Sequence, residues 1–167
     1  MRLALHELLT IHPKLRGHPT DLCKFGGLAL QRAGHTSPVP AEVVHDDVES
    51  SAEIEWRAED PALLDVLDKN RVTEDGAEAV ALSYVHSKAG WVVKRRMNRG
   101  ESADWLLTKE TRGLALEVSG TTEQDPLSRL KAKRRQVSHC TLADDYVVDR
   151  LAVVVGFGGP MILAGRP

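Results

Sequence analysis

Residues 100–120 read GESADWLLTKETRGLALEVSG, and this stretch decides the fold that the chain can adopt. Two short apolar runs, at 103–108 and 114–119, flank the polar segment 109–113. Apolar runs of this length around a polar segment with a glycine are typical of two antiparallel strands joined by a turn. The stretch therefore predicts a β-hairpin with a loop of about five residues.

The register of this hairpin brings two carboxylates together. If Thr108 lies opposite or nearly opposite Leu114, counting back places Asp104 within one residue of Glu117. Directly paired side chains on neighbouring strands are roughly 5 Å apart. Mg²⁺ needs only one or two protein carboxylates and keeps several waters, so Asp104 and Glu117 are candidate ligands for Mg²⁺ or Mn²⁺.

An alternative interpretation needs no metal. Asp104 starts a strand beside a turn, and Glu117 could simply face solvent on a half-exposed sheet. In a sheet covered on both faces, however, Glu117 would be buried, and an unpaired buried carboxylate is costly. A cation would offset that cost.

Length, cysteine content and hydropathy limit the class of protein. A chain of 167 residues fits one domain, or one domain with an extension, and can bury a core without disulfides. The two cysteines, Cys23 and Cys140, lie far apart, and no secretory segment is recognisable, which indicates a reducing, cytoplasmic setting. No run approaches the roughly 18 to 20 apolar residues that span a bilayer, so we expect no membrane insertion.

Charge is distributed unevenly along the chain, although the net charge is only −2. Residues 41–80 contain thirteen acidic and three basic residues, a net charge of −10, whereas residues 90–136 contain eleven basic and six acidic residues, a net charge of +5. Basic charge therefore surrounds the carboxylate pair and would attract a polyanion. The alternative is a solvated surface whose charges pair within the molecule.

The remaining patterns predict an α/β protein. Residues 1–72 form an N-terminal extension of helices and strands, in which 3–9 (LALHELL) is an amphipathic helical stretch, Thr20 caps a helix ending near Ala33, and 41–45 and 52–56 are a pair of strands. Residues 73–167 form the core, unless the two parts are one continuous domain. Its predicted elements are a helix from Thr73, strands at 91–96, 146–155 and 161–164, the hairpin, and a helix at 126–137.

With these elements placed, residues 73–155 resemble the core of the restriction-endonuclease-like fold, the PD-(D/E)XK nuclease superfamily. In that superfamily a helix with a glutamate leads through a glycine into a strand, and a hairpin then offers an Asp and a Glu-x-Lys in front of a supporting helix. Here Glu78, Gly90 and Asp104 occupy the first three positions, and Glu117-Val118-Ser119 occupies the fourth. The resemblance implies a mixed β-sheet flanked by helices.

The chain departs from the family pattern at Ser119, which stands where the family has a lysine. The resemblance implies hydrolysis of DNA phosphodiester bonds by metal-activated water, with Asp104 and Glu117 as metal ligands and Glu78 as an added ligand or water holder. Some members place the functional lysine on another element. Lys131 and Lys133 on the predicted helix are candidates for that role, and Lys94 is a third.

The same resemblance implies DNA as the partner. We also expect a homodimer, and a protein partner on the N-terminal extension. The candidate nucleic-acid-binding residues are Lys94, Arg95, Arg96, Arg99, Arg134 and Arg135, joined by Arg129. Two alternatives stay open. One is a degenerate member that binds nucleic acid or protein without cleavage, which Ser119 favours; the other is a protein-interaction module built on the acidic segment 41–80.

Overall fold

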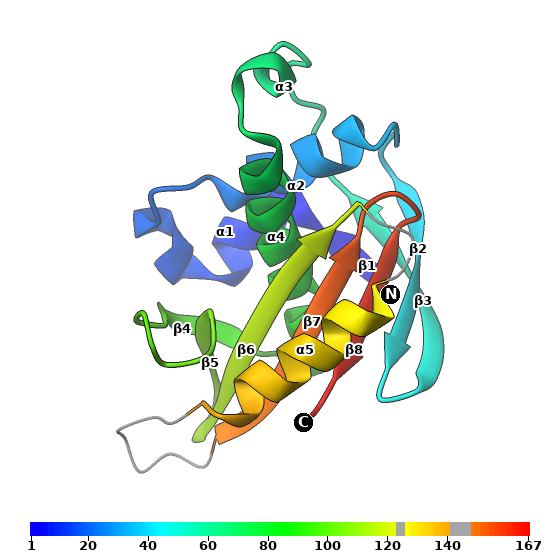
Figure 1. The fold of residues 1–167 in the computed structure, drawn as a ribbon. Helices are drawn as coiled ribbons and strands as arrows, with labels where there is room; N and C mark the ends of the chain where they lie inside the picture. Colours follow the sequence, from blue (N-terminus) through cyan, green and yellow to red (C-terminus); the bar gives the residue numbers. More distant parts are fainter. Residues whose placement is uncertain (123–125, 141–147) are drawn as a thin grey trace.

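The computed structural model describes residues 1–122, 126–140 and 148–167 (Figure 1). In these residues one eight-stranded mixed sheet has the order β1-β3-β2-β8-β7-β6-β5-β4. The strands are β1 (Arg2–Ala4), β2 (Val39–His45), β3 (Val48–Glu55), β4 (Val92–Arg96), β5 (Trp105–Lys109), β6 (Arg112–Thr121), β7 (Val148–Gly156) and β8 (Met161–Gly165). The α-helices are α1 (Leu8–Ile11), α2 (Leu22–Arg32), α3 (Leu63–Val66), α4 (Lys69–Ala89) and α5 (Leu127–Ser138), with 3₁₀ turns η1 (Leu5–Glu7) and η2 (Pro13–Gly17).

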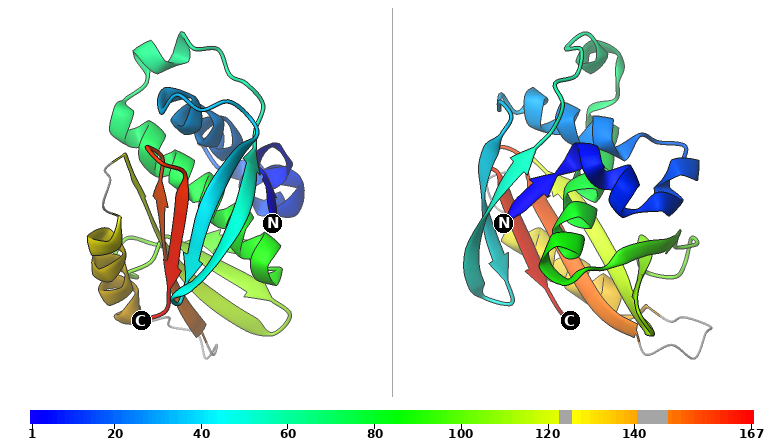
Figure 2. Two further views of the ribbon diagram at one scale, coloured as in Figure 1. Left: turned by 90° about the vertical axis from the view of Figure 1, so that its right-hand side faces the viewer. Right: turned by 180° about the vertical axis from the view of Figure 1, so that it is seen from behind.

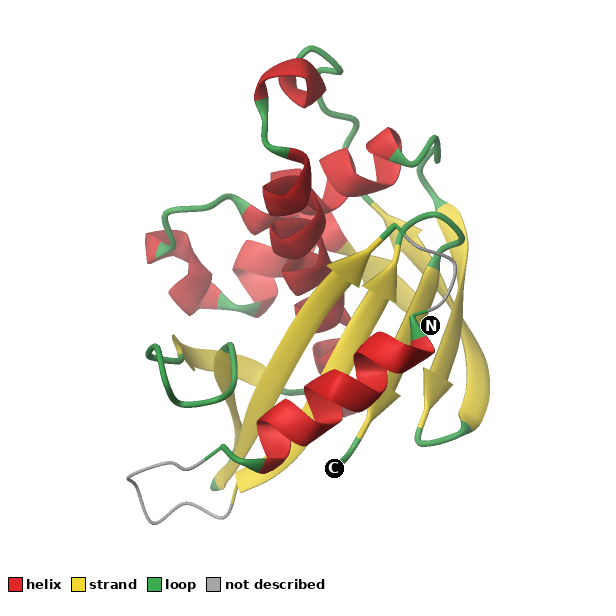
Figure 3. Cartoon of the chain, in the orientation of Figure 1, coloured by secondary structure: helices red, strands yellow, loops and turns green. Residues whose placement is uncertain are grey.

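Helices cover both faces of the sheet, as Figures 2 and 3 show. Helices α4 and α2 lie on one face, over the main hydrophobic core, and α5 crosses the other face. A smaller apolar cluster lies under α5 and consists of Met97, Leu106, Ala115, Val137, Cys140 and Ala152. The predicted α/β class, with a mixed sheet flanked by helices, is confirmed.

Helix α4 is the central element of the larger layer. Asp68 caps its first turn by accepting a hydrogen bond from the backbone N–H of Arg71, so the helix begins four residues before the predicted Thr73. Residues 76–85 are all buried, as expected for a helix packed on every side. Gly90, at φ 75°, ends it in the left-handed conformation that the sequence predicts. No helix in the described ranges, α4 included, is both long and apolar enough to cross a bilayer.

The start of α4 rests directly on the backbone of β6. A Cβ atom added at Gly120 would lie 2.3 Å from the carbonyl oxygen of Thr73, closer than real Cβ contacts. Glycine is therefore the residue that allows this approach. The contact fixes the N-terminal end of α4 against the strand that carries Glu117.

Part of the predicted N-terminal helix is instead a strand. Residues Arg2–Ala4 form β1, which pairs in parallel with β3, and helical turns begin only at Leu5. Pairing with β3 satisfies backbone groups that a lone first helical turn would leave open. Leu3, Leu5 and Leu8 are buried in the main core, so the apolar pattern was informative even though the element type was wrong. The predicted pair of strands at 41–45 and 52–56 is confirmed as the antiparallel hairpin β2–β3.

The decisive hairpin is tighter than predicted. Lys109 pairs with Arg112, which leaves Glu110 and Thr111 as a two-residue turn rather than a five-residue loop. Glu110 has φ 54°, the left-handed conformation that two-residue hairpin turns require. Strand β7 is described from Val148, and the predicted start at Tyr146 lies outside the described residues.

The sheet continues across the predicted division between 1–72 and 73–167. Strand β2 pairs in parallel with β8, with Val43 opposite Ile162, and antiparallel pairing then links β8 to β7. Strands from both parts of the chain thus share one hydrogen-bonded sheet. The position of a domain boundary at residues 72 and 73 stays a prediction.

A buried histidine ties the N-terminal segment to the core. His12 is 0 % exposed; its Nδ1 accepts a hydrogen bond from the backbone N–H of Val93 at 3.2 Å, and its Nε2 lies 3.2 Å from the carbonyl oxygen of Leu82. Because Nδ1 accepts, Nε2 carries the proton and donates to Leu82. Burial lowers the pKa of His12 to about 4, so the folded protein holds the neutral ring.

His12 should make the protein less stable in acid. The unfolded chain takes up a proton near pH 6.5, whereas folded His12 resists it down to about pH 4. Over the range from pH 7 to pH 5 this difference lowers the free energy of unfolding by about 2 kcal/mol. We predict that His12→Gln destabilises the protein at pH 7 but removes this part of the pH dependence, as measured by urea denaturation at both pH values.

The control is His139→Gln, the same substitution at an exposed position. Comparing each variant with the wild type cancels the contribution of other titrating groups. An equal loss between pH 7 and pH 5 in the wild type and in His12→Gln would contradict the assignment.

Candidate functional site

Asp104 and Glu117 lie side by side on the sheet face that α5 covers. Trp105 pairs with Leu116 across β5 and β6, and continuing this register by one residue places Asp104 opposite Glu117. Two hydrogen bonds hold Asp104 there: its N–H donates to the carbonyl oxygen of Leu116 at 3.0 Å, and its Oδ2 accepts from the N–H of Val118 at 2.8 Å. The predicted juxtaposition of these carboxylates is confirmed.

Glu117 is more buried than Asp104, with 1 % of its surface exposed. Its Oε1 accepts from Nζ of Lys133 at 2.5 Å, whereas Oε2 is buried without a hydrogen-bond partner in the described part of the chain. Burial and the negative charge of Asp104 raise the pKa of Glu117 to about 7, and Lys133 opposes this rise. A second cation placed beside Oε2 would stabilise the ionised pair.

Helix α5 supplies positive charge where the family pattern has a lysine on the strand. Arg129 donates to Oγ of Ser119 at 3.2 Å, and Lys133, one helical turn later, contacts Glu117. Glu117 and Ser119 point to the same face of β6 because side chains alternate along a strand. The buried Ser119 hydroxyl thus accepts a hydrogen bond from the Arg129 guanidinium. The ammonium group of Lys133 contacts the carboxylate of Glu117 directly.

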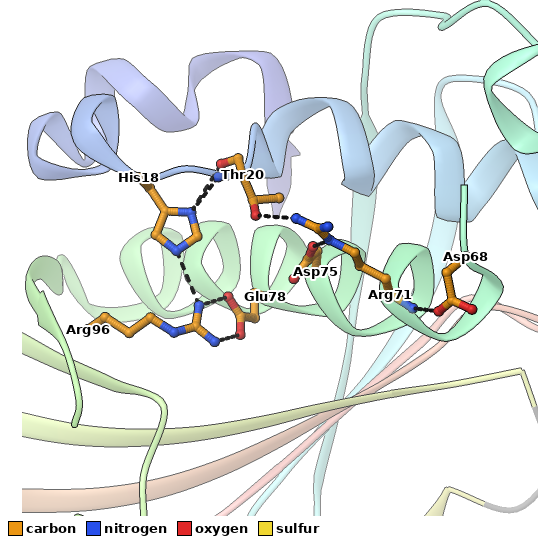
Figure 4. A network of polar contacts seen from close by, with 7 residues as sticks. All are labelled: His18, Thr20, Asp68, Arg71, Asp75, Glu78 and Arg96. Atoms are coloured by element: carbon orange, nitrogen blue, oxygen red, sulfur yellow. Dashed lines mark hydrogen bonds and ion pairs between the residues drawn. The ribbon is translucent and has the colours of Figure 1, made fainter. Parts of the chain in front are cut away.

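Glu78 is held by an arginine. It is 6 % exposed, so it does not lie on a solvated helix face, and both of its oxygens accept from Arg96, at 2.7 and 2.8 Å. Figure 4 shows Glu78 and Arg96 in a wider network that includes His18, whose Nε2 lies 3.3 Å from Nη1 of Arg96. The Arg96 guanidinium also stacks 4.9 Å from the ring centroid of Trp105.

Glu78 is electrostatically linked to the carboxylate pair. Burial raises the pKa of Glu78 to about 7; Arg96 opposes the rise, and the charge of Asp104 adds to it. With both oxygens engaged by Arg96, Glu78 acts on the site by orienting that arginine. A role as a direct metal ligand would require the ion pair to open.

A surface pocket of about 380 Å³ gives access to the pair. Arg96, Arg99, Asp104, Glu117 and Gln136 are among its lining residues. Its rim is the loop between β4 and β5. That loop is closed by a bidentate ion pair of Arg95 with Glu101, at 2.8 Å for both contacts, and by a hydrogen bond from Asn98 N–H to Glu101.

The predicted basic residues fall into two groups. Arg95 and Arg96 are bound in the ion pairs described above, and Lys94 is half-buried. The exposed group comprises Arg99 on the pocket rim and Lys131, Arg134 and Arg135 on α5, of which Arg134 extends toward Gly165 of β8. Lys131 therefore does not join Lys133 at the carboxylates.

Sequence reasoning missed the network around Arg96. It placed Arg96 among surface phosphate ligands and did not involve His18 or Trp105 at all. Arg96 and Trp105 face each other across β4 and β5, a pairing that depends on an irregularity between Val93 and Arg95. The spacing of Arg129 and Lys133, four residues apart, was the available signal for a common face on α5.

The donor set fits a divalent cation that keeps most of its waters. No cluster of three or more His, Cys, Asp or Glu side chains suited to a metal occurs among the described residues, so a cation beside Asp104 and Glu117 would have only these two carboxylate ligands there. Such a site suits Mg²⁺, which is held by one or two carboxylates. Comparisons with protein-family models, with curated proteins and with solved structures found no match.

We predict that Arg96→Met destabilises the protein more at pH 8 than at pH 5.5. Without Arg96, ionised Glu78 is buried and unpaired, which costs about 1–3 kcal/mol, and its folded pKa rises further. A raised folded pKa weakens stability as the pH climbs above about 4.5 and leaves it intact below. Chemical denaturation at both pH values measures the difference.

Two variants serve as controls. Arg95→Met breaks a bidentate pair whose carboxylate, Glu101, is more exposed, so its effect should stay within about 1 kcal/mol. The double variant Arg96→Met with Glu78→Gln should recover stability at pH 8. A loss for Arg96→Met that is independent of pH would count against the buried-charge explanation.

Proposed function

We propose that this chain is a divalent-metal-dependent nuclease with a restriction-endonuclease-like fold that hydrolyses phosphodiester bonds of DNA. The observation that carries the proposal is the Asp104–Glu117 pair, in which Oε2 of Glu117 is buried without a partner in the described residues while Lys133 occupies Oε1. A site with two adjacent carboxylates, one bound ammonium and one free buried oxygen is suited to a cation and a phosphate.

The arrangement of elements supports the proposed fold. Helix α4 with Glu78 leads through Gly90 into β4, the β5–β6 hairpin carries the carboxylates, and α5 connects to β7, which pairs in parallel with β6. This is the order that the resemblance implies for residues 73–155. Helix α5 lies across β6, β7 and β8, so it covers the strand of the hairpin that carries Glu117 (Figure 1).

In the proposed reaction, Asp104 and Glu117 would hold Mg²⁺ or Mn²⁺. When bound, such an ion lowers the pKa of water and offsets phosphate charge. Lys133 would replace the lysine of the family motif, because its ammonium group contacts Glu117 and stabilises negative charge next to that carboxylate. Arg96, oriented by Glu78 and Trp105, and Arg99 on the pocket rim bind the phosphates that flank the scissile bond.

The setting and partners are part of the proposal. Cys23 and Cys140 are both free thiols, which supports a reducing, cytoplasmic location. Exposed Arg134, Arg135 and Lys131 on α5 would contact the DNA backbone next to the pocket. A homodimer would present two sites to two strands, and residues 1–72 would select a protein partner or substrate.

One observation favours the alternative of a binding module without cleavage. Ser119 carries no charge, and in the protein alone Lys133 and Arg129 already engage the polar groups of β6. Such an arrangement could retain phosphate affinity while holding no metal. The two experiments below separate cleavage from binding.

For cleavage, we predict Mg²⁺- or Mn²⁺-dependent cutting of DNA, tested with linear duplex, branched and single-stranded substrates. Asp104→Asn, Glu117→Gln and Lys133→Met should each lower the rate by about 10²-fold or more, the scale on which one charge-stabilising group acts. Glu110→Gln, which removes an exposed carboxylate from the turn of the same hairpin, is the control. Cutting that survives both carboxylate substitutions in folded protein would refute the site.

For metal binding, we predict that calorimetric Mn²⁺ titration separates ligands from the lysine. Glu117→Gln and Asp104→Asn should weaken binding by about tenfold or more, because each removes one of two charged ligands. Lys133→Met should bind Mn²⁺ at least as tightly as the wild type, since a neighbouring positive charge is gone, although it no longer cuts. DNA binding without Mn²⁺ binding in the wild type would favour the binding module.

A further inference from the structure

A second pocket opens on the other face of the sheet, away from Asp104 and Glu117. It has a volume of about 230 Å³ and lies between the C-terminal end of α4 and the ends of β5, β6 and β7. Leu114 and Leu151 line it and belong to the main core under α4, whereas Glu117, an odd number of positions along β6 from Leu114, points to the α5 side. The proposed nuclease site does not use this pocket.

Positive charge predominates in the lining of this pocket. Among the described residues that line it, Asp149 is the one acidic residue, and four are cationic, namely Lys88, Lys109, Arg112 and Arg166. Arg112 is ion-paired with Asp149, and Nε of Arg166 lies 3.8 Å from Oδ2 of Asp46. Lys88 and Lys109 have no carboxylate within 4 Å in the described parts of the chain, so two positive charges remain for a ligand.

The uncharged part of the lining combines polar and apolar groups. The hydroxyl of Tyr84 and Nδ1 of His45 share a hydrogen bond of 2.5 Å. Burial lowers the pKa of His45, Asp46 opposes this, and the charges of Lys88 and Arg166 add to it, which favours the neutral ring. Trp91, with the Arg112 guanidinium 5.8 Å from its ring centroid, and Leu114 form an apolar wall.

The size and chemistry of the pocket define one class of ligand. Its volume lies below the range of roughly 300–1,000 Å³ that is usual for sites of drug-sized molecules, so the ligand is small. Two unpaired lysines match a dianion, and an apolar wall beside them matches a ring or short hydrocarbon. A phosphate monoester carries close to two negative charges at pH 7.

We propose that this pocket binds a small organic phosphate monoester, with Lys88 and Lys109 on the phosphate and its organic part against Trp91 and Leu114. The proposal is independent of the nuclease site, because no residue is shared and no metal is needed. Its ligand could be a free metabolite or a terminal phosphate of a nucleic acid, which share this chemistry.

The test uses phenyl phosphate as the probe, with the full chain in EDTA at 150 mM NaCl. Binding is followed by NMR from the indole N–H of Trp91, assigned by Trp91→Phe. We expect saturable shifts with phenyl phosphate, weaker binding of inorganic phosphate, and none of phenol at the same concentrations. Lys88→Met combined with Lys109→Met should weaken phenyl phosphate binding at least tenfold.

The matched control is Lys14→Met with Lys69→Met, which removes the same charge from two exposed positions that do not line the pocket. Equal affinity in the two double variants, or inorganic phosphate binding as tightly as phenyl phosphate, would overturn the proposal. Native circular dichroism of each variant verifies folding. Because EDTA removes divalent ions, failure here leaves the proposed nuclease function untouched, and failure of cleavage leaves this result untouched.

A second arm distinguishes the two sources of the phosphate. A short oligonucleotide with a 5′-phosphate is compared with its 5′-hydroxyl counterpart in the wild type and in the Lys88→Met, Lys109→Met variant. A preference for the phosphorylated end that disappears in the variant assigns the site to nucleic-acid termini. Equal binding of both oligonucleotides, together with saturable binding of phenyl phosphate, assigns it to a free metabolite.

Discussion

The contact between Lys133 and the buried carboxylate of Glu117 links the two layers on which the candidate site depends. Strand β6 lies inside the sheet and is buried along nearly its whole length, so a glutamate there needs positive charge nearby. Helix α5 supplies it and otherwise offers few apolar residues, with Val137 its one fully buried side chain. Polar contacts with Glu117 and Ser119 therefore act together with the apolar cluster around Val137 in holding α5 over β6.

A similar arrangement occurs on the other side of Asp104. Glu78, on α4, is buried and ion-paired with Arg96. The charge of Asp104 raises the pKa of both Glu78 and Glu117, while Arg96 and Lys133, from different elements, oppose the rise. The positions of α4, α5 and the hairpin are consequently coupled through charge.

The sequence predicted the parts of this arrangement that depend on local periodicity. Alternation of apolar residues identified the β5–β6 hairpin, and its register was specific enough to pair Asp104 with Glu117. Gly90 marked the C-terminal end of α4, whereas the start of the helix was predicted at Thr73, four residues too late. The opening residues were harder, because Leu3, Leu5 and Leu8 fit a helix by spacing, and only β3, fifty residues away, makes Arg2–Ala4 a strand.

Interactions between distant elements could not be predicted in the same way. The ion pair of Glu78 with Arg96 was not predicted, since nothing local signals that β4 will place Arg96 against this glutamate. The choice of Lys133 over Lys131 depends on the rotation of α5 about its axis. A lining such as that of the second pocket, drawn from β2, α4, β5, β6, β7 and the segment after β8, has no counterpart in any short motif.

The pairing of β2 with β8 has a consequence for how the chain reaches this structure. Residues 39–55 can form their hairpin early, but the sheet edge on which it docks is β8, residues 161–165, so the hairpin must wait for a segment more than a hundred residues later. Contacts of such long range slow folding. During synthesis on the ribosome the hairpin emerges well before its neighbour, with one strand edge unprotected. Acidic residues of β2 and β3 would disfavour pairing of that edge with other chains.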